Sequence, residues 1–288
     1  MTLHLRFWSL TLMSIDCIEA GTFAPPRVAS AQAEKLHVVS WNIARGSRID
    51  EIGEFLTDAN ADLILLQESD CNSRRTAYRN VAKELAHKLG MNYSFGIEFQ
   101  ELGQGSRSSP AYHGQATLSR WPLSQPRVIR FRRQSKFWNP RWWVPPLAAF
   151  QRRIGGRMAL TTNLAIGGRS LIAYNLHLES RNSDELRFSQ FAELLDDTRR
   201  YGFDIVIVLA GDFNFDITAA REKTVLQGAG FENPFASLAM PTILSSSSRH
   251  GRAIDWILIR GAVARSFQVH NSIRASDHYP LSLTLQLS

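Results

Sequence analysis

Apolar runs and stretches with helical spacing alternate along the first half of the chain. Residues 36–41 and 61–67 are almost continuously apolar, which is typical of strands buried on both faces. Apolar residues recur at helical spacing in 49–56 and 78–89, and Gly90 ends the second stretch, as glycine commonly ends a helix. The pattern then predicts four strands, at 93–99, 115–121, 158–166 and 170–176.

The second half of the chain repeats this alternation. Helices are predicted at about 183–200 and 219–227, and strands at 205–210, 253–259, 263–269 and 281–287. Gly167-Gly168 joins two of the predicted strands and is a two-residue hairpin signal. Because helices flank two runs of strands, the pattern predicts an α+β fold in which helices cover a sandwich of two sheets.

The composition is that of an ordinary soluble globular protein, with 288 residues of which 44% are hydrophobic and 20% charged. Only Cys17 and Cys71 are present, which excludes a disulfide framework and a cysteine-rich zinc site. A bound metal must therefore have oxygen and imidazole ligands. The sequence contains no apolar run of about 18 residues, so a spanning helix is not expected.

Residues 1–33 resemble a segment for export. Arg6 precedes the apolar residues 7–15, and small residues at 28–33 form a cleavage-like site, although Asp16 and Glu19 interrupt the apolar character. Two interpretations stay open: a signal peptide, which predicts a secreted or periplasmic protein, or an N-terminus without structure on a cytoplasmic one. In both, residues 34–288 form the functional domain.

The net charge of +7 is distributed very unevenly. Residues 102–178 contain no acidic side chain but twelve basic ones, whereas the rest of the chain has 21 basic and 26 acidic residues. Within this region, residues 126–156 fit no helical or alternating pattern and hold three of the seven tryptophans. This apparent insertion predicts contact with an anionic partner, either nucleic acid or a membrane surface; the alternative is a structural loop. Three arginines at its end and just after it border a predicted strand and are candidates for contact with substrate phosphate: Arg152, Arg153 and Arg157.

Polar side chains recur where the predicted strands end, which is where catalytic groups gather on a rigid sheet. Each alone has an ordinary explanation, such as a turn residue or a buried, hydrogen-bonded histidine. Together they form a series of motifs: WNI at 41–43, LQE at 66–68, LSRWP at 118–122, NLHL at 175–178, GDFN at 211–214, IDWI at 254–257 and SDHYP at 276–280. This series resembles the endonuclease/exonuclease/phosphatase superfamily over about residues 36–288. The resemblance implies a four-layer α/β/β/α sandwich of two mixed β-sheets flanked by helices.

The resemblance also implies a metal site for phosphate-ester hydrolysis. Glu68 is the expected ligand of Mg²⁺, because hard cations prefer carboxylate oxygens, and Mn²⁺ or Ca²⁺ are alternatives. Asn42 would hold this site together, and Asp277 is a second candidate ligand. Asp212 would orient the attacking water, with Asn214 on a phosphate oxygen.

Histidines are the expected donors to the phosphate. His177 and His278 can donate to its oxygens or move a proton, and Asp255 is expected to orient one of them. Which histidine it orients is left open by the sequence. Asn175 is a candidate for substrate binding. Tyr112 is either a hydroxyl on the phosphate side or a packing residue.

These observations predict a Mg²⁺-dependent hydrolase of phosphate esters, with nuclease-like or sphingomyelinase-like phosphodiesterase activity through direct attack of water on phosphorus. Two alternatives are a phosphomonoesterase that acts on inositol phosphates or phosphoinositides, and an inactive nucleic-acid- or lipid-binding module with the same fold. The partners expected are a phosphate-ester substrate, either nucleic acid or phospholipid, and, through residues 126–156, a peripheral membrane contact. A monomer is expected.

Overall fold

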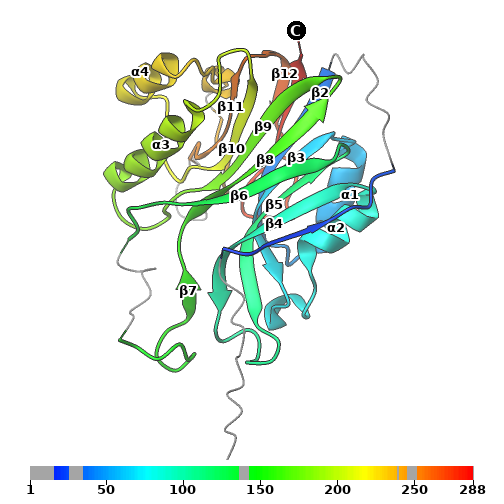
Figure 1. The fold of residues 1–288 in the computed structure, drawn as a ribbon, viewed down its shortest axis with the longest axis vertical. Helices are drawn as coiled ribbons and strands as arrows, with labels where there is room; N and C mark the ends of the chain where they lie inside the picture. The colour runs from blue at the N-terminus through cyan, green and yellow to red at the C-terminus, as the bar shows by residue number, and fades with distance from the viewer. Residues whose placement is uncertain (1–15, 26–34, 136–142, 239, 245–251, 288) are drawn as a thin grey trace, which may run out of the picture.

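Two mixed β-sheets packed face to face form the centre of the molecule in the computed structural model, which describes residues 16–25, 35–135, 143–238, 240–244 and 252–287 (Figure 1). The larger sheet has eight strands in the order β1-β4-β5-β3-β2-β13-β12, with β7 also paired to β4, and the smaller has five in the order β11-β10-β9-β8-β6. The larger sheet consists of β1 (Ile18–Gly21), β2 (Lys35–Arg45), β3 (Leu63–Cys71), β4 (Asn92–Glu101), β5 (Ala111–Ser119), β7 (Arg153–Gly155), β12 (Val263–Val269) and β13 (Leu281–Gln286). The smaller one consists of β6 (Leu123–Arg130), β8 (Met158–Ile166), β9 (Arg169–His177), β10 (Val206–Asp212) and β11 (Asp255–Arg260).

Helices cover the outer face of each sheet. The helices α1 (Ile49–Ala59) and α2 (Val81–Leu89) pack on the larger sheet, and α3 (Asp184–Thr198) and α4 (Ala220–Gly228) on the smaller one (Figure 1). Two short 3-10 helices, η1 (Arg74–Thr76) and η2 (Pro234–Ser237), lie in loops. The predicted four-layer α/β/β/α sandwich of two mixed sheets is confirmed. No helix in the described part of the chain has the length and apolar character that crossing a membrane requires.

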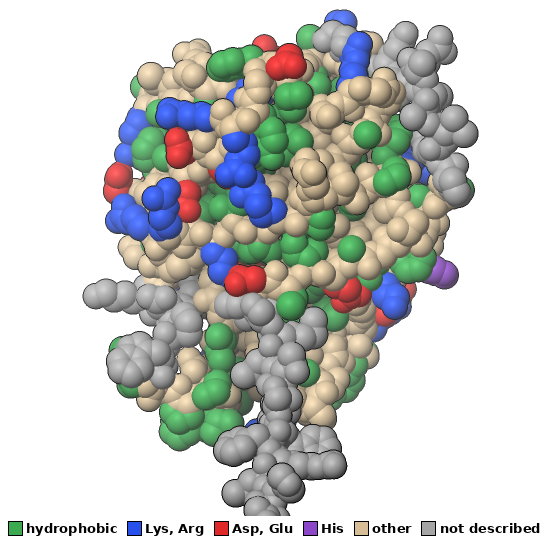
Figure 2. Space-filling view, in the orientation of Figure 1, with side chains coloured by type: hydrophobic (Ala, Val, Ile, Leu, Met, Phe, Trp, Pro, Cys, Tyr) green, Lys and Arg blue, Asp and Glu red, His purple; other side chains and the backbone are tan. Residues whose placement is uncertain are grey.

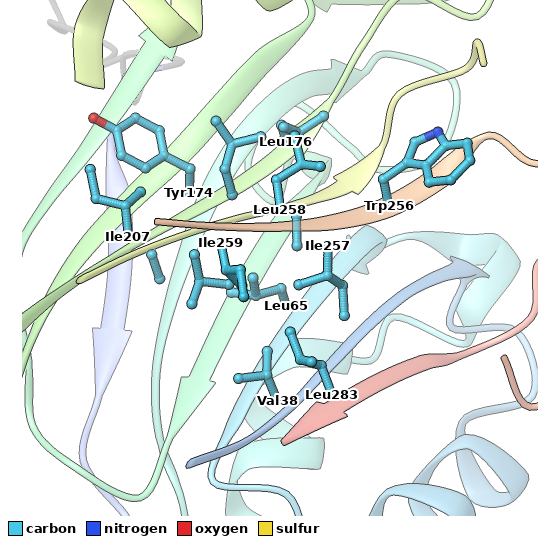
Figure 3. Close-up of a cluster of buried hydrophobic side chains, with 14 of the residues drawn as sticks. Val38, Leu65, Tyr174, Leu176, Ile207, Trp256, Ile257, Leu258, Ile259 and Leu283 are labelled. Carbon is cyan, nitrogen blue, oxygen red and sulfur yellow. The ribbon is translucent and has the colours of Figure 1, made fainter. Parts of the chain in front are cut away.

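The continuous apolar runs of the sequence arise because the strands are buried on both faces. In β2, Val38 belongs to the core between the sheets, while Val39 and Trp41 belong to the core beneath α1 and α2. Figure 3 shows Val38 among residues of the first of these cores, facing Ile257 and Ile259 across the sheet interface. Each side chain that leaves water in this way contributes about 1.5–3 kcal/mol to folding.

Local signals mark both ends of α2 and the hairpin between β8 and β9, and of these Gly90 and Gly167-Gly168 were predicted from the sequence. Asn80 precedes α2, and its side-chain oxygen accepts a hydrogen bond from the backbone N–H of Lys83. Gly90 ends α2 with a φ of 61°, in the left-handed region that glycine adopts without strain. Gly167 and Gly168 have φ values of 57° and 79°, which close the predicted hairpin between β8 and β9.

Two segments that the sequence analysis set apart contribute strands. Residues 18–21, inside the predicted export segment, form β1 and pair with β4, so the interpretation as an N-terminus without structure is wrong there. Residues 126–130, assigned to the insertion, belong to β6 and pair with β8. A register shift between Ser124 and Arg127 hides the alternation of this strand. The remaining insertion is therefore shorter than predicted, and residues 1–15, 26–34 and 136–142 lie outside the described residues.

Candidate active site

The sheet topology brings the predicted polar residues to one end of the sandwich. The strands β2 and β3 run parallel, so Asn42 and Glu68 lie near the carboxyl ends of neighbouring strands. The parallel strands β9 and β10 pair His177 directly with Asp212. Because β11 is antiparallel to β10, its first residue, Asp255, lies opposite Asp212.

The loop before β13 is attached to the end of β2 and contributes His278. The backbone carbonyl of His278 accepts a hydrogen bond from Trp41 Nε1 at 2.8 Å, and Ser276 Oγ donates to the carbonyl of Asn42 at 2.7 Å. These contacts carry His278 into the buried centre of the site, while Asp277 stays exposed beside it. The adjacent Asp and His of the SDHYP motif therefore have different environments.

Asp212 lies at the centre of the site and is 2% exposed. Its Oδ2 accepts a hydrogen bond from Asn42 Nδ2 at 3.1 Å, and its Oδ1 accepts one from the backbone N–H of Asn214 at 2.8 Å. His177 Nε2 and His278 Nε2 lie 3.5 Å and 3.8 Å from the same Oδ2. The carboxylate thus has a fixed orientation between two imidazoles.

Gly211 allows this arrangement, because a Cβ at its position would lie 2.0 Å from the carbonyl oxygen of Leu176, and its φ is 148°. Asn214 follows with a φ of 58°, and its Nδ2 donates to the carbonyl of Leu178 at 3.1 Å. Backbone in the left-handed region at a non-glycine residue is uncommon and clusters at functional sites. The GDFN motif therefore combines a close strand contact with a turn beside Asp212.

Asp255 orients His278, which answers the question that the sequence left open. His278 Nδ1 lies 2.9 Å and 3.0 Å from the two carboxylate oxygens of Asp255, and Thr242 Oγ1 donates to Oδ2 of Asp255 at 2.6 Å. Burial lowers the pKa of His278, but the carboxylates of Asp255 and Asp212 outweigh it and raise that pKa to about 10. The imidazole is thus held protonated, with Nε2 toward Asp212.

His177 is paired with a carboxylate that the sequence analysis missed. His177 Nδ1 lies 3.4 Å from Oε2 of Glu98, which is 0% exposed. Arg157, predicted as a substrate ligand, donates to Oε1 of Glu98 at 2.6 Å, and its Nη1 lies 2.9 Å from His177 Nδ1. Although burial raises the pKa of Glu98, Arg157 and His177 hold it well below its ordinary value. Glu98 is a charged residue at an inward-facing position within the apolar strand β4. A charge at such a position is the signal that could have indicated it.

Glu68 has the features expected of a metal ligand. Glu68 lies at a register shift between β3 and β5, its φ is 55°, and its side chain is half-buried. Bulges of this kind re-aim side chains next to active sites. Burial acts to raise the pKa of Glu68, but the surrounding cations, His113 foremost, lower it to about 2. Among the described residues its carboxylate accepts no hydrogen bond, so its oxygens are available to a cation.

These donors fit Mg²⁺. Glu68 supplies a carboxylate and Asn42 an amide oxygen on the adjacent strand, which is the donor chemistry that a hard cation prefers. Asp212, Asp255 and His278 also place ligand atoms within 4.8 Å of one another. In that second group His278 and Asp255 already hydrogen-bond to each other, so Glu68 is the better ligand.

A second buried histidine and carboxylate lie beside Glu68. His113 Nδ1 lies 2.8 Å from Oδ1 of Asp70, and Arg75 donates two hydrogen bonds to the same carboxylate at 2.6 Å and 2.7 Å. Neither Asp70 nor Arg75 was predicted from the sequence. The spacing of Asp70, two positions after Glu68, was the available signal, because in a regular strand this spacing places both side chains on the same face.

Two predicted site residues have other roles in the structure. Asn175 is 0% exposed, donates to the carbonyls of Leu66 and Ala116, and accepts from Gln67, so it ties the two sheets together. Tyr112 packs in the core beneath α1 and α2. Consecutive strand residues point to opposite faces, so His113 faces the sheet interface whereas Tyr112 faces away.

The three arginines predicted to contact substrate phosphate lie in different environments. Arg153 pairs with Glu101 at 2.7 Å, and Arg152 is exposed, whereas Arg157 lies in the site. Further along the same region, Arg127 pairs with Asp197 at 2.6 Å and Arg130 with Asp16 at 2.8 Å. Much of the positive charge that stands out in the sequence is therefore neutralised by carboxylates from distant parts of the chain.

A family model for the endonuclease/exonuclease/phosphatase family matches residues 39–278, which include both histidines, Glu68, Asp212 and Asp255. The chain belongs to the endonuclease/exonuclease/phosphatase family. Membership in this family supports a phosphoesterase function and is in keeping with the divalent-metal chemistry of the donor set. No curated protein matches the chain in a sequence comparison.

Solved structures of this family share the fold at low sequence identity. An endonuclease/exonuclease/phosphatase from Beutenbergia cavernae is 19% identical, with a TM-score of 0.64, and the match covers 88% of this chain and 72% of that one. A family protein from Bacteroides thetaiotaomicron is 15% identical, with a TM-score of 0.63 and coverage of 88% and 98%. Humanized D. rerio TDP2 is 17% identical, with a TM-score of 0.60 and coverage of 88% and 99%. At these identities the likeness establishes the fold alone.

Proposed function

We propose that the protein is a Mg²⁺-dependent phosphodiesterase in which water attacks phosphorus directly, without a covalent intermediate. The observation that carries this proposal is the position of Asp212, whose carboxylate lies between two histidines that are each paired with a further buried carboxylate. A phosphodiester resists attack because its oxygens are anionic, so catalysis needs a base for the water and donors for the phosphate. This site supplies both kinds of group.

Glu68 and Asn42 would hold the metal, with the exposed Asp277 as a further ligand at the rim. Ser276 Oγ, which donates to the carbonyl of Asn42, also lies 3.2 Å from Oδ1 of Asp277 and keeps that carboxylate close to the end of β2. A bound Mg²⁺ would neutralise charge on the phosphate and on the leaving oxygen.

The chain's own residues carry the proton and the phosphate contacts. Asp212 accepts a proton from the attacking water, and the hydrogen bond from Asn42 orients its carboxylate. His278, held protonated by Asp255, donates Nε2–H to a non-bridging oxygen. His177, fixed by Glu98 and Arg157, donates from the other side. Each donor is fixed before substrate binds, which is the condition for stabilising the charge that develops in the transition state.

Hydrolysis of a nitrophenyl phosphodiester by Asp212→Asn tests this proposal. The substitution keeps the shape but removes the base, so the rate should fall about 100-fold or more. Asp216→Asn is the matched control, because Asp216 is an exposed carboxylate on the same loop. EDTA should abolish activity and added Mg²⁺ should restore it. Turnover of Asp212→Asn within about threefold of the wild type, or activity that persists in EDTA, would contradict the mechanism.

The same assay separates the competing functions. A phosphomonoesterase would hydrolyse the nitrophenyl monoester faster than the diester. An inactive binding module would hydrolyse neither, although it would be expected to have lost acidic and histidine positions that are all present here.

A further inference from the structure

An apolar strip is exposed on the loop between β6 and β7. The strip consists of residues 143–150, which include no charged side chain. Trp143 is 67% exposed, Phe150 62% and Leu147 37%. Figure 2 shows hydrophobic side chains at the lower left of the molecule, where Figure 1 places this loop. Single exposed apolar residues are common, but a group of large ones marks a contact surface.

The strip has a defined backbone conformation. The N–H of Leu147 donates to the carbonyl of Pro145 at 2.7 Å, and the N–H of Phe150 donates to the carbonyl of Leu147 at 2.9 Å. Pro145 and Pro146 restrict the chain further, and Gln151 Nε2 donates to the carbonyl of Val144 at 3.2 Å. A contact surface that is ordered in advance loses less entropy when it binds.

The strip lies at the same end of the sandwich as the site. Strand β7, which follows it, pairs Gly155 with Phe99 and Arg153 with Glu101 of β4. The next residue of the chain, Gly156, donates to the carbonyl of Glu98, and Arg157 is part of the site. A surface bound to the strip is therefore brought close to Asp212 and its histidines.

The surroundings of the strip are cationic. Arg133 and Arg152 lie in the same loop, before and after the strip, and the N–H of Leu102 in the loop that carries Arg107 donates to the carbonyl of Arg152. All three are exposed, and their guanidinium groups form no ion pair within the part of the chain that the structure describes. Tryptophan and phenylalanine beside exposed arginines are the composition of proteins that lie at the interface of an anionic bilayer.

We propose that residues 143–150 dock the protein on an anionic lipid bilayer and that its substrate is a phosphodiester in a lipid headgroup. The second part of this proposal rests on the proposed function. Nucleic acid is the less favoured partner, because arginines that would grip a phosphate backbone are neutralised by protein carboxylates, among them Arg127, Arg130 and Arg153. A bilayer requires only the apolar strip and the few cations beside it.

Binding of the full chain to vesicles tests the docking surface independently of activity. Wild type should sediment with vesicles of phosphatidylcholine and phosphatidylglycerol, and Trp143→Ser/Phe150→Ser should bind about 30-fold more weakly, equivalent to about 2 kcal/mol. Phe203→Ser is the matched control, because Phe203 is 71% exposed at the opposite end of β10 and should bind as wild type does. Arg133→Gln/Arg152→Gln should weaken binding to vesicles that contain phosphatidylglycerol, but should leave binding to vesicles of phosphatidylcholine alone unchanged.

Activity measured on two substrates separates this proposal from the proposed function. Trp143→Ser/Phe150→Ser should hydrolyse a soluble nitrophenyl phosphodiester at the wild-type rate, and phospholipid in vesicles at least about tenfold more slowly. Equal vesicle binding by this variant and wild type overturns the docking surface, as does an equal loss in Phe203→Ser. Binding to duplex DNA or self-association that depends on Trp143 and Phe150, without vesicle binding, also overturns it. Loss of soluble activity in Asp212→Asn leaves the docking surface unaffected.

Discussion

Removal of the Arg157 guanidinium should strongly destabilise the protein, because Glu98 would remain buried without its main partner. The two side chains are 4% and 0% exposed, and Arg157 Nη1 lies 2.6 Å from Glu98 Oε1. At an effective dielectric constant near 20, a pair of charges about 4 Å apart interacts by about 4 kcal/mol. Breaking a buried pair by removing one partner typically costs about 3–5 kcal/mol. Arg157→Met should lower the free energy of unfolding by a similar amount at neutral pH.

The pH dependence gives this prediction a sign. The pKa of Glu98 is lower in the folded protein than in the unfolded chain. Ionised Glu98 therefore stabilises the fold at neutral pH, and this stabilisation is lost as the pH falls. In Arg157→Met this pKa rises, so the stability gap between variant and wild type should narrow below about pH 4, where unfolded glutamate is protonated.

Urea denaturation of four proteins measures the pair: wild type, Arg157→Met, Glu98→Gln and the double variant. The double variant should be less destabilised than the sum of the single variants, with a coupling free energy of about 3–4 kcal/mol. A coupling below about 1 kcal/mol, or a stability gap that does not change with pH, would refute the reasoning, because the ion pair would then contribute no more than an exposed one.

Two further predictions concern the site and the N-terminus. Asp255→Asn removes the carboxylate that does most to raise the pKa of His278 to about 10, so the protonated imidazole should be lost at lower pH. Wild-type activity should persist above pH 8, whereas the variant's pH–rate profile should fall near neutrality; an unchanged alkaline limb would count against the role of His278. Deletion of residues 1–33 should lower Tm by about 4 °C or more, because β1 and the hydrogen bonds of Glu19 are lost. Deletion of residues 1–15 alone keeps β1, and equal Tm values for both deletions would show that β1 adds no stability.

The order of strands and helices could be read from local patterns. The apolar runs at 36–41 and 61–67 mark β2 and β3 because these strands are buried on both faces. Gly90 and Gly167-Gly168 mark a helix end and a hairpin because their backbone conformations suit glycine. Polar residues at or after the ends of buried strands indicated Asn42, Glu68, His177 and Asp212, and His278 stands just before the last predicted strand.

The partners of those residues could not be read in the same way. Glu98 lies within an apolar strand, and Asp70 lies near the end of another. Neither has a local sign that a histidine or arginine from another part of the chain lies opposite it. Tyr112 and His113 are neighbours in sequence, yet only the pleat of β5 and the packing of α1 and α2 decide which of them faces the sheet interface.

The sequence by itself determined the element order, the family resemblance and most of the residues grouped around Asp212. Tertiary structure alone decided that Asp255 orients His278, that Asn175 ties the sheets, and that Glu101 and Asp197 neutralise arginines of the basic segment. The physical reason is the range of each effect. Periodicity reports what one strand or helix buries, whereas a charge or hydrogen bond is defined by two groups that the sheets bring together from distant positions.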